Sequence, residues 1–378
     1  MNSAARPHHI LHVFPSFGIG GVELRMASVL NGLPGQLRHS IIALGSNYDA
    51  ASRIKPDVDV SYSPPPADRG YLMRRLAGCA RFIQAVSPDL LLTYNWGAIE
   101  WALANRWRPK VRHIHLESGF GKEEAIVQKR RRVWTRRLAL KHSEALIVPS
   151  RFLARIASTA WRLPQAKIHH IPNGVDCALY SQPADPGLQA EFGSGTKGVL
   201  IAAIAPLRPE KNIGRLLRAF ARVSTDRPPR LLIIGDGGER DKLTAEAAQL
   251  GISERVRFAG TVGQPEKVIG MIDIFALSSD TEQMPNTVLQ AMAAGKPVAA
   301  PAVGDIADMV AAENRPFICA PADTQALSVS LERLIDSPES RRSIGQANRQ
   351  KAVDDYNLPL MIARYQALLM NDNTGAAG

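Results

Sequence analysis

The sequence predicts an α/β protein with two parallel-sheet domains. At 378 residues the chain is long enough for two domains of roughly 150 residues. Apolar runs typical of buried strands alternate with helical patterns, which indicates βαβ units and parallel sheets. The alternation stops near Pro172 and then starts again, so each half has its own series. Hydrophobic residues make up 45% and charged residues 21% of the chain, which excludes disordered and fibrous proteins.

The first half begins with an apolar strand at 10–14, a glycine-containing loop and a helix at 22–33. Short apolar runs then alternate with longer amphipathic ones. We expect strands at 40–44, 58–62, 90–94, 112–116 and 145–148, and helices at 72–86, 98–106 and about 123–141.

The second half follows a stretch at 176–196 that is rich in Gly, Pro and Ser and indicates a linker. We expect strands at 198–205, 230–234, 256–258, 274–277, 296–300 and 317–318, and helices at 213–223, 241–250 and 285–294. A final helix at 359–369 follows a break at 356–358, and we expect the tail from residue 371 to be disordered.

The sequence predicts a cytoplasmic protein. No apolar run approaches the roughly 20 residues of a membrane span, and the N-terminus lacks the apolar core of a signal peptide. Cys79, Cys177 and Cys319 lie far apart with no C-x-x-C spacing, so neither a zinc site nor a disulfide framework is indicated.

The positive charge lies almost entirely in the first half. Residues 1–180 hold 25 Lys and Arg against 12 Asp and Glu, a net charge of +13, whereas residues 181–378 hold 21 against 23, a net charge of −2. This asymmetry favours an anionic partner for the first half: membrane lipid, a phosphorylated acceptor or nucleic acid. The alternative is a basic surface that only maintains solubility.

The strongest basic stretch is K-R-R-R-V-W-T-R-R at 129–137. Apolar residues recur around it near helical spacing, namely Ile126, Val127, Val133, Trp134 and Leu138. A basic amphipathic helix with a tryptophan is typical of a membrane-surface contact, which Arg130 to Arg137 would make at the inner face of the plasma membrane. A helix packed on the domain with a solvated cationic face fits about equally well. No nucleic-acid-binding module accompanies the charge, so we expect no nucleic acid partner.

A glycine loop, G-I-G-G-V-E, follows the first strand. Gly20 and Gly21 let backbone amides approach an anion at a helix N-terminus. A dinucleotide fingerprint would need a further glycine where Glu23 stands, so the loop is weak support for a dehydrogenase. A tight turn without a ligand is the other interpretation.

Two loops of the second half could bind an anion. In P-L-R-P-E-K-N, Arg208 and Lys211 would stand at a strand end, where they could neutralise a diphosphate or form a solvated charged loop. After the strand at 274–277 comes Glu282, and Pro285 is expected in the first turn of the next helix.

The helix that follows Glu282 adds further candidate contacts to this second loop. The amides of Asn286 and Thr287 would then be free for a phosphate. Gln290 lies eight residues after Glu282, so that one side chain could contact a sugar and the other a ribose.

Five segments occur in a characteristic order: G-G-V-E at 20–23, I-P-N-G-V-D at 171–176, L-R-P-E-K-N at 207–212, I-G-D-G-G-E-R at 234–240 and T-E-Q-M-P-N-T-V-L-Q-A-M-A-A-G-K-P-V at 281–298. In this order the chain resembles the retaining GT-B glycosyltransferases of family four (glycosyl transferases group 1). The resemblance covers nearly the whole chain, and the second half is the more diagnostic.

The resemblance implies a GT-B fold, with two Rossmann-like domains that face each other across a cleft and a C-terminal helix that crosses back to the first. Residues 1–178 with the helix at 357–371 would form an acceptor-binding domain, and residues 179–356 an NDP-sugar-binding domain. It also implies metal-independent transfer without a cofactor, since the NDP-sugar is a substrate.

The resemblance assigns roles to single residues. Lys211 would bind the donor diphosphate, and Glu282, the first acid of the family's E-x7-E pair, would hold donor-sugar hydroxyls. His115, in H-I-H-L-E-S-G, would lie near the anomeric centre, with His113 as a weaker candidate. The remaining donor contacts would come from Gly20, Gly21, Arg208, Gly235, Gly237, Met284, Pro285, Asn286, Thr287 and Gln290.

The chain departs from the family pattern at two positions. The second acid of the pair is Gln290, which can still hydrogen-bond a ribose diol, and the family's usual arginine falls on Pro206, where Arg208 could compensate. The Asp57-Val58-Asp59 segment has the Asp-x-Asp form of some metal-dependent transferases, but it falls in an expected strand, so no metal site is predicted.

Two functions from different classes follow. The first is a hexosyltransferase that moves a sugar from an NDP-sugar to a lipid-linked or membrane-associated acceptor in polysaccharide, lipopolysaccharide or glycolipid assembly. The second is a degenerate GT-B protein that binds nucleotide or glycan without turnover. Lys211 and Glu282 favour the first, and Gln290 and Pro206 favour the second.

Overall fold

The computed structural model describes residues 8–35, 37–66, 70–120, 124, 128–193, 198–226 and 228–370. The chain divides into two compact units: unit 1 is Met1–Pro172 with Met361–Gly378, and unit 2 is Asn173–Leu360. The tail that the sequence predicts to be disordered lies outside the described residues.

The boundaries between the two units differ by a few residues from the expected ones, which lay between residues 178 and 179 and between residues 356 and 357. The first falls earlier because Asn173 donates a hydrogen bond to the Met284 carbonyl and Val175 donates one to the Tyr356 carbonyl, both within unit 2. The second falls later because the amide of Leu358 donates to the carbonyl of Val175.

Unit 1 is built on a seven-stranded parallel sheet in the order β3-β2-β1-β4-β5-β6-β7. Its strands are β1 (His8–Phe14), β2 (Leu37–Ala43), β3 (Val60–Ser63), β4 (Leu90–Tyr94), β5 (Arg112–Leu116), β6 (Ala145–Val148) and β7 (Ile168–His170). Strand β1 pairs with both β2 and β4, so the strand order reverses beside it. Ligands of doubly wound folds bind at the carboxyl ends of the strands at such a point.

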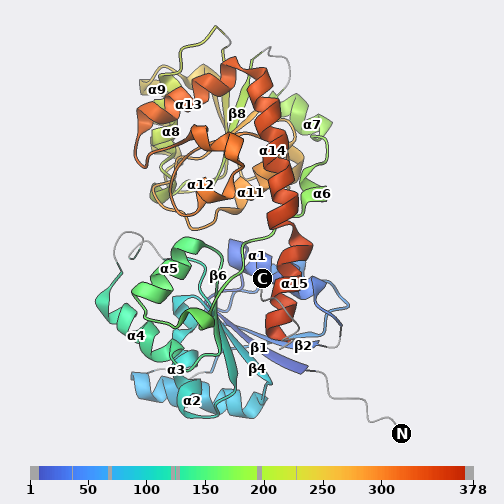
Figure 1. The fold of residues 1–378 in the computed structure, drawn as a ribbon, viewed down its shortest axis with the longest axis vertical. Helices are drawn as coiled ribbons and strands as arrows, with labels where there is room; N and C mark the ends of the chain where they lie inside the picture. The colour runs from blue at the N-terminus through green and yellow to red at the C-terminus, as the bar shows by residue number, and fades with distance from the viewer. Residues whose placement is uncertain are drawn as a thin grey trace. The chain divides into compact units, whose positions relative to one another are not determined.

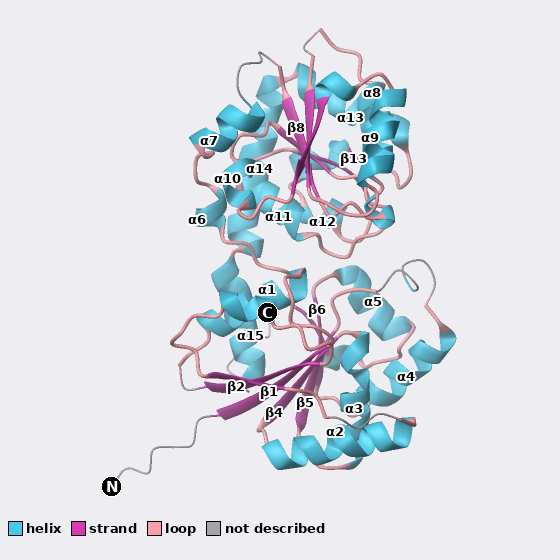
Figure 2. Cartoon of the chain, turned by 180° about the vertical axis from the view of Figure 1, so that it is seen from behind, coloured by secondary structure: helices cyan, strands magenta, loops and turns pink. Residues whose placement is uncertain are grey.

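Helices cover both faces of this sheet (Figure 1, Figure 2). On one side lie α1 (Gly21–Gly32) and α15 (Leu358–Leu369), and on the other α2 (Leu72–Val86), α3 (Ile99–Trp107), α4 (Arg130–Leu140) and α5 (Arg151–Thr159). Ile83, Trp101 and Leu153 from the second group are buried with Leu11 and Val13 of β1 in one apolar core.

Unit 2 has a six-stranded parallel sheet in the order β10-β9-β8-β11-β12-β13. Its strands are β8 (Leu200–Ile204), β9 (Arg230–Ile234), β10 (Val256–Gly260), β11 (Ile274–Ala276), β12 (Val298–Pro301) and β13 (Ile318–Cys319). Apart from the edge strand β10, which is only half-buried, these strands are apolar and almost fully buried, because helices again pack on both faces.

The helices of unit 2 are divided between two apolar cores. One contains α8 (Ile213–Ala221), α9 (Arg240–Gln249) and α13 (Thr324–Asp336). The other contains α6 (Cys177–Tyr180), α10 (Pro265–Ile269), α11 (Asn286–Ala293) and α12 (Ile306–Met309) with part of α14 (Pro338–Tyr356). The short α7 (Pro186–Leu188) lies in the segment expected to be a linker.

The predicted elements are largely those observed. Strands β4, β5, β6 and β9 and helix α2 have the predicted bounds. Helices α5, α13 and α14, strand β7 and the short helices α6, α7, α10 and α12 were not predicted. Helix α14 was missed because its buried stripe is narrow and contains Gly345 and Asn348 beside Ile344 and Ala352. Gly345 packs so closely on Gly295 that a side chain at position 345 would collide with the carbonyl of Gly295.

Two local predictions need correction. The basic helix expected at 123–141 is α4, which spans Arg130–Leu140, whereas residues 121–123 and 125–127, including Ile126 and Val127, lie outside the described residues. Asp57 and Asp59 lie in the turn before β3 and not in a strand.

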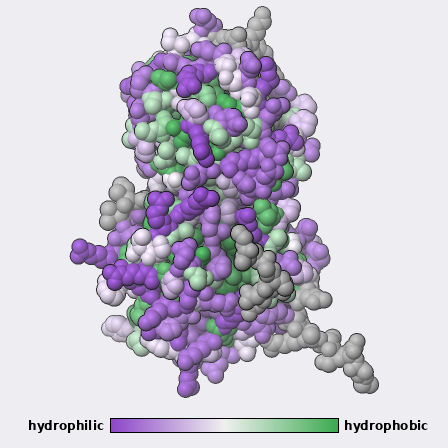
Figure 3. All heavy atoms as spheres, viewed as in Figure 1, coloured by the Kyte–Doolittle hydropathy of each residue, from purple (hydrophilic) through white to green (hydrophobic). Residues whose placement is uncertain are grey.

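Within the described ranges, no helix combines the length and the apolar character that crossing a membrane requires. Hydrophilic residues cover most of the face drawn in Figure 3, and hydrophobic ones appear there in small groups. The three cysteines are buried free thiols.

Candidate functional site

The loops that carry the predicted donor site meet at the carboxyl edge of the unit 2 sheet. Lys211 ends a short 3-10 turn (Pro209–Lys211) after β8, and the next residue, Asn212, caps α8 by accepting from the Arg215 amide at 3.1 Å. The loop after β11 is fastened to this turn, since the Asp280 amide donates to the Glu210 carbonyl at 2.9 Å and Ser278 Oγ donates to the Lys211 carbonyl at 3.1 Å.

The fold brings the two predicted catalytic residues of unit 2 into direct contact. Lys211 Nζ donates to Glu282 Oε1 at 2.6 Å, and the two side chains are 22% and 11% exposed. Ser279 Oγ donates to the same carboxylate oxygen at 2.7 Å and is itself buried. The carboxylate is thus held between a cation and a hydroxyl, at a place that still reaches solvent.

The start of α11 lies beside this pair in the same loop. Pro285 is the N-cap residue of the helix and not its first residue, as the sequence predicted, because its ψ of 121° is extended. The first intrahelical donor is the Val288 amide, which reaches the Pro285 carbonyl at 3.1 Å. The amides of Asn286 and Thr287 precede it and are those that a helix N-terminus can offer to an anion.

Asn173 was not among the predicted site residues, yet it organises this loop. Its side-chain amide donates to the Met284 carbonyl and to Asn286 Oδ1, both at 2.9 Å. Asn173 and Met284 are both buried. The signal was present in the sequence, because Asn173 belongs to the I-P-N-G-V-D segment, but the contact links residues that are 111 positions apart.

Glycines fix the approach of neighbouring loops. Gly304, at a φ of 59°, leaves no room for a side chain against the carbonyls of Glu282 and Gln283. Gly235, at a φ of 137°, is packed in the same way against the carbonyl of Ala205, and Gly237 against that of Leu207. At these positions the backbone requires glycine, which accounts for Gly235 and Gly237 without a ligand.

Within the described residues, the side chains of Gln290 and Arg208 form no hydrogen bond or ion pair with Lys211 or Glu282, although the Lys211 amide donates to the Arg208 carbonyl at 3.0 Å. Gln290 is half-buried, and its side chain interacts with that of Tyr180 in α6. Burial and the nearby Glu266 raise the pKa of Tyr180. Arg208 is exposed and forms no ion pair with any described residue.

In unit 1 the predicted glycine loop ends at the start of α1. Gly20 is the N-cap residue and Gly21 the first helical residue. The Glu23 carboxylate occupies the space where a Gly20 side chain would lie, and burial raises the pKa of Glu23. Arg25 of the same helix donates to Ser118 Oγ at 2.5 Å, at the end of β5.

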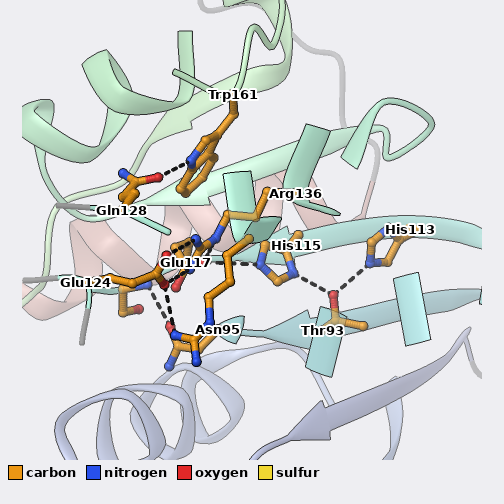
Figure 4. Close-up of polar contacts among 11 residues, drawn as sticks. Thr93, Asn95, His113, His115, Glu117, Glu124, Gln128, Arg136 and Trp161 are labelled. Carbon is orange, nitrogen blue, oxygen red and sulfur yellow. Dashed lines mark hydrogen bonds and ion pairs between the residues drawn. The ribbon is translucent and has the colours of Figure 1, made fainter. Parts of the chain in front are cut away.

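His115 is completely buried in β5 (Figure 4). Its Nδ1 lies 2.7 Å from Thr93 Oγ1, and its Nε2 lies 3.8 Å from Glu117 Oε2. The same Thr93 hydroxyl lies 2.8 Å from His113 Nε2, while Ser143 Oγ lies 2.8 Å from His113 Nδ1. Burial and the neighbouring His115 lower the pKa of His113 to about 3. Both histidines are buried, with His115 fully enclosed and His113 5% exposed.

The arginines of α4 do not form one surface. Arg136 is completely buried, with its Nε 3.2 Å from Glu117 Oε2 and its Nη2 3.1 Å from Glu124 Oε2 (Figure 4). Its guanidinium also lies over the rings of Trp96, Phe120 and Trp161, at 4.9–5.3 Å. Arg132 pairs with Glu124 at 3.1 Å. Two of the cations assigned to a membrane contact therefore face inward.

Among the described residues, no group of three or more His, Cys, Asp and Glu side chains is arranged to hold a metal ion.

Comparison with known families now identifies the two units. The family "Glycosyltransferase Family 4" matches residues 19–179, and "Glycosyl transferases group 1" matches residues 188–351. The chain is built from two glycosyltransferase-family domains. The first match covers most of unit 1, and the second covers most of unit 2.

Curated relatives of this glycosyltransferase-family chain are distant. N-acetyl-alpha-D-glucosaminyl L-malate synthase of Bacillus anthracis is 24% identical over 56% of the chain and 57% of its own length. The 2-deoxystreptamine glucosyltransferase of Streptomyces kanamyceticus is 26% identical over 62% of the chain and 63% of its own length. The chain thus spans little more than half the length of these two relatives.

Solved structures share the fold. HepE of Anabaena, in complex with UDP, superposes with a TM-score of 0.82 at 18% identity, over 96% of this chain and 100% of that one. Sucrose-phosphate synthase of Thermosynechococcus elongatus gives 0.81 at 16% identity, over 96% and 98%. These matches and the two parallel sheets confirm the predicted GT-B fold class.

Proposed function

We propose that the chain is a retaining, metal-independent hexosyltransferase that moves a sugar from an NDP-sugar to an acceptor hydroxyl. The observation that carries the proposal is the Lys211–Glu282 pair with Ser279, held at the carboxyl edge of a parallel sheet beside a helix N-terminus. Retention of the anomeric configuration and metal independence rest on the resemblance in motif order.

The pair suits the chemistry of a departing nucleoside diphosphate. A departing diphosphate needs positive charge aimed at the developing anion, and Lys211 with the amides of Asn286 and Thr287 would supply it. Glu282 would then exchange the Lys211 ammonium for hydroxyls of the donor sugar, while Ser279 keeps the carboxylate oriented. In the absence of donor, each charge of the pair neutralises the other.

The other predicted residues support this centre. Asn173 holds the Met284 carbonyl and Asn286, whose backbone groups would contact sugar and phosphate. Gly20 and Gly21, at the start of α1, are assigned to phosphate binding by the resemblance alone. His115 remains in the proposal as a positioning residue, because its buried ring is hydrogen-bonded to Thr93 and lies near Glu117.

The donor nucleotide is left open by the relatives. The HepE structures contain UDP or UDP-glucose, whereas two mannosyltransferase relatives, from Mycolicibacterium smegmatis and Corynebacterium glutamicum, are GDP-mannose-dependent. Those two enzymes act on phosphatidylinositol mannosides, which supports a lipid-linked acceptor. D-inositol 3-phosphate glycosyltransferases are also among the relatives, so a phosphorylated acceptor is the competing choice.

A membrane contact of unit 1 is part of the proposal, with a narrower set of residues than the sequence suggested. Arg130 and Arg131 are exposed at the start of α4, and Trp134 is 68% exposed one turn later. These groups, and not Arg132 or Arg136, would meet an anionic surface.

The test is a panel of UDP-, GDP- and ADP-sugars with Lys211→Ala beside the native protein. We expect hydrolysis or transfer with one donor, lowered about 100- to 1,000-fold by Lys211→Ala, the scale for loss of one transition-state contact. Lys242→Ala is the matched control, since Lys242 is an exposed lysine of the same unit, paired only with Glu239. NMR of the product reports its anomeric configuration, and a chelator should leave the rate unchanged. Native activity in Lys211→Ala would remove this residue from the mechanism.

A degenerate binder is the second candidate, favoured by the Gln290–Tyr180 contact at the place of the family's second acid. It predicts nucleotide binding without transfer or hydrolysis for every donor. The same panel, read by thermal shift and by product formation, separates the two proposals.

A further inference from the structure

A pocket of about 430 Å³ lies in unit 1 at the amino edge of the sheet, where α3 and α4 end. Val111 before β5, His113 in β5 and Ser143 after α4 are among the residues that line it. Because glycosyltransferase folds bind donor at the carboxyl edge, this pocket has no part in the proposed reaction.

The pocket carries unbalanced positive charge. Arg106, Lys110 and His142 line it, and none of them forms an ion pair with any residue in the described ranges. Partial burial and the charges of Arg106, Lys141, Lys167 and Lys110 lower the pKa of His142, so every charged group that acts on this ring is a cation. A cluster of this kind is stabilised by a bound anion.

Part of this charge has a structural explanation and part has none. Lys167 Nζ donates to the carbonyls of Lys141 and Ser143, at 3.0 and 2.8 Å, and thereby caps the end of α4. Arg106 Nη1 reaches the Leu138 carbonyl only at 3.4 Å. Lys110, at a φ of 62°, is exposed in the loop before β5 and has no such carbonyl contact among the described residues.

Two exposed apolar side chains lie at or beside the rim of the pocket. Trp107, which lines it, is 52% exposed, and Leu138, next to the lining residue Ala139, is 47% exposed. Leu138 follows Trp134 by one helical turn, so both lie on the outer face of α4. This face runs from Arg130 at the carboxyl edge of the sheet to the pocket at the amino edge.

We propose that this pocket binds the phosphate of an anionic phospholipid headgroup, with Arg106 and Lys110 as its cations and with Trp107 and Leu138 in the interfacial layer beside it. The inference rests on the proposed function only in that the chain works at a membrane. A soluble phosphate compound would satisfy the cations, but it would leave these two apolar side chains in water. The exposed tryptophan and leucine therefore decide for the lipid.

The test compares two variants that each remove two positive charges from unit 1. The pocket variant is Arg106→Gln with Lys110→Asn, since asparagine tolerates the positive φ at residue 110. The control is Arg53→Gln with Lys55→Gln, two exposed residues near the α1 side of the sheet. Urea unfolding of all three proteins checks that the variants fold.

Binding is measured by co-sedimentation with vesicles of phosphatidylglycerol and phosphatidylcholine. We expect the pocket variant to bind about 30-fold more weakly, from two lost cations near an anionic surface, and the control to stay within about threefold. Equal losses in both variants would show that only diffuse charge acts, and would overturn the inference. Stabilisation of the native protein by glycerol 3-phosphate, lost in the pocket variant and without vesicle binding, would overturn the lipid assignment.

Donor hydrolysis by the same proteins separates this inference from the proposed function. The pocket variant should hydrolyse donor at the native rate, because none of its changes touches the carboxyl edge. Pocket-dependent vesicle binding without turnover would refute only the enzyme proposal. Turnover without vesicle binding would refute only the lipid site.

Discussion

The Lys211–Glu282 pair of unit 2 and the Arg136 cluster of unit 1 use similar charges in opposite ways. Arg136 and Glu117 are completely buried, and the guanidinium is enclosed by two carboxylates and three aromatic rings. Lys211 and Glu282 retain exposure, and each is the other's ionic partner. A buried charge must find all its partners inside the protein, whereas an accessible pair can exchange its partner for a ligand.

This difference shows why residue type alone does not identify a site. Arg136 lies in the most basic stretch of the sequence, for which a membrane contact was predicted, yet its contacts are structural. Lys211 stands in a loop with an ordinary charge pattern, yet it is the cation beside the candidate carboxylate.

The largest expected effect is the loss of stability in Arg136→Met. This change leaves Glu117 and Glu124 buried without their shared cation, and breaking a buried pair in this way costs about 3–5 kcal/mol. Lys211→Met should lower the free energy of unfolding by less than this, because its pair keeps partial access to water and Ser279 still donates to Glu282. Urea denaturation measures both.

Arg131→Met is the matched control for Arg136, because Arg131 lies in the same helix and is exposed. It should change stability by less than about 0.5 kcal/mol. Similar losses for Arg131→Met and Arg136→Met would mean that the buried cluster contributes nothing of its own.

Acid pH should weaken unit 1 through its buried histidines. Burial, with a smaller effect of His9, lowers the pKa of His39 to about 4, and burial with His115 lowers that of His113 to about 3. Both are neutral in the folded protein, so the unfolded chain binds more protons below pH ~6.5. The stability is fully present above that pH and is lost as the pH falls toward 4.

For His39 alone the loss approaches about 3 kcal/mol at pH 4. Urea midpoints at pH 7.5, 6, 5 and 4 measure it. His39→Gln should make the profile shallower, because the amide does not titrate in this range, while His113 still contributes its own slope. A profile that stays level from pH 7.5 to 5 would contradict the assignment of neutral buried rings.

The smallest expected effect concerns Gln290. A carboxylate that accepts from a ribose diol exceeds a neutral amide by about 1 kcal/mol, so Gln290→Glu should lower the donor KM about fivefold. Gln290→Ala should raise the KM, and kcat should not change, because the ribose lies away from the reacting bond. Glu282→Gln should instead lower kcat. Steady-state kinetics with the accepted donor decides, and a fall in kcat for Gln290→Ala would refute the ribose role.

Local sequence patterns predicted most of the elements and the residue types at the candidate site. The apolar runs of β4, β5, β6 and β9 give their bounds because period and hydrophobicity depend on near neighbours. Helix α14 was not predicted, because its buried stripe contains Gly345 and Asn348. Pro285 was expected inside its helix but is the N-cap residue.

The sequence by itself determined the two α/β domains, the loops that follow β8 and β11, and Lys211 and Glu282 as the candidates they carry. Only the tertiary structure decided which of these residues meet. The contact of Lys211 with Glu282 spans 71 positions and that of Asn173 with Met284 spans 111. Such contacts depend on the strand order β10-β9-β8-β11-β12-β13, which places β8 beside β11 although β9 and β10 separate them in the chain. Burial, which makes Arg136 structural and leaves Lys211 accessible, is likewise a property of the packed sheet and helices and not of the local sequence.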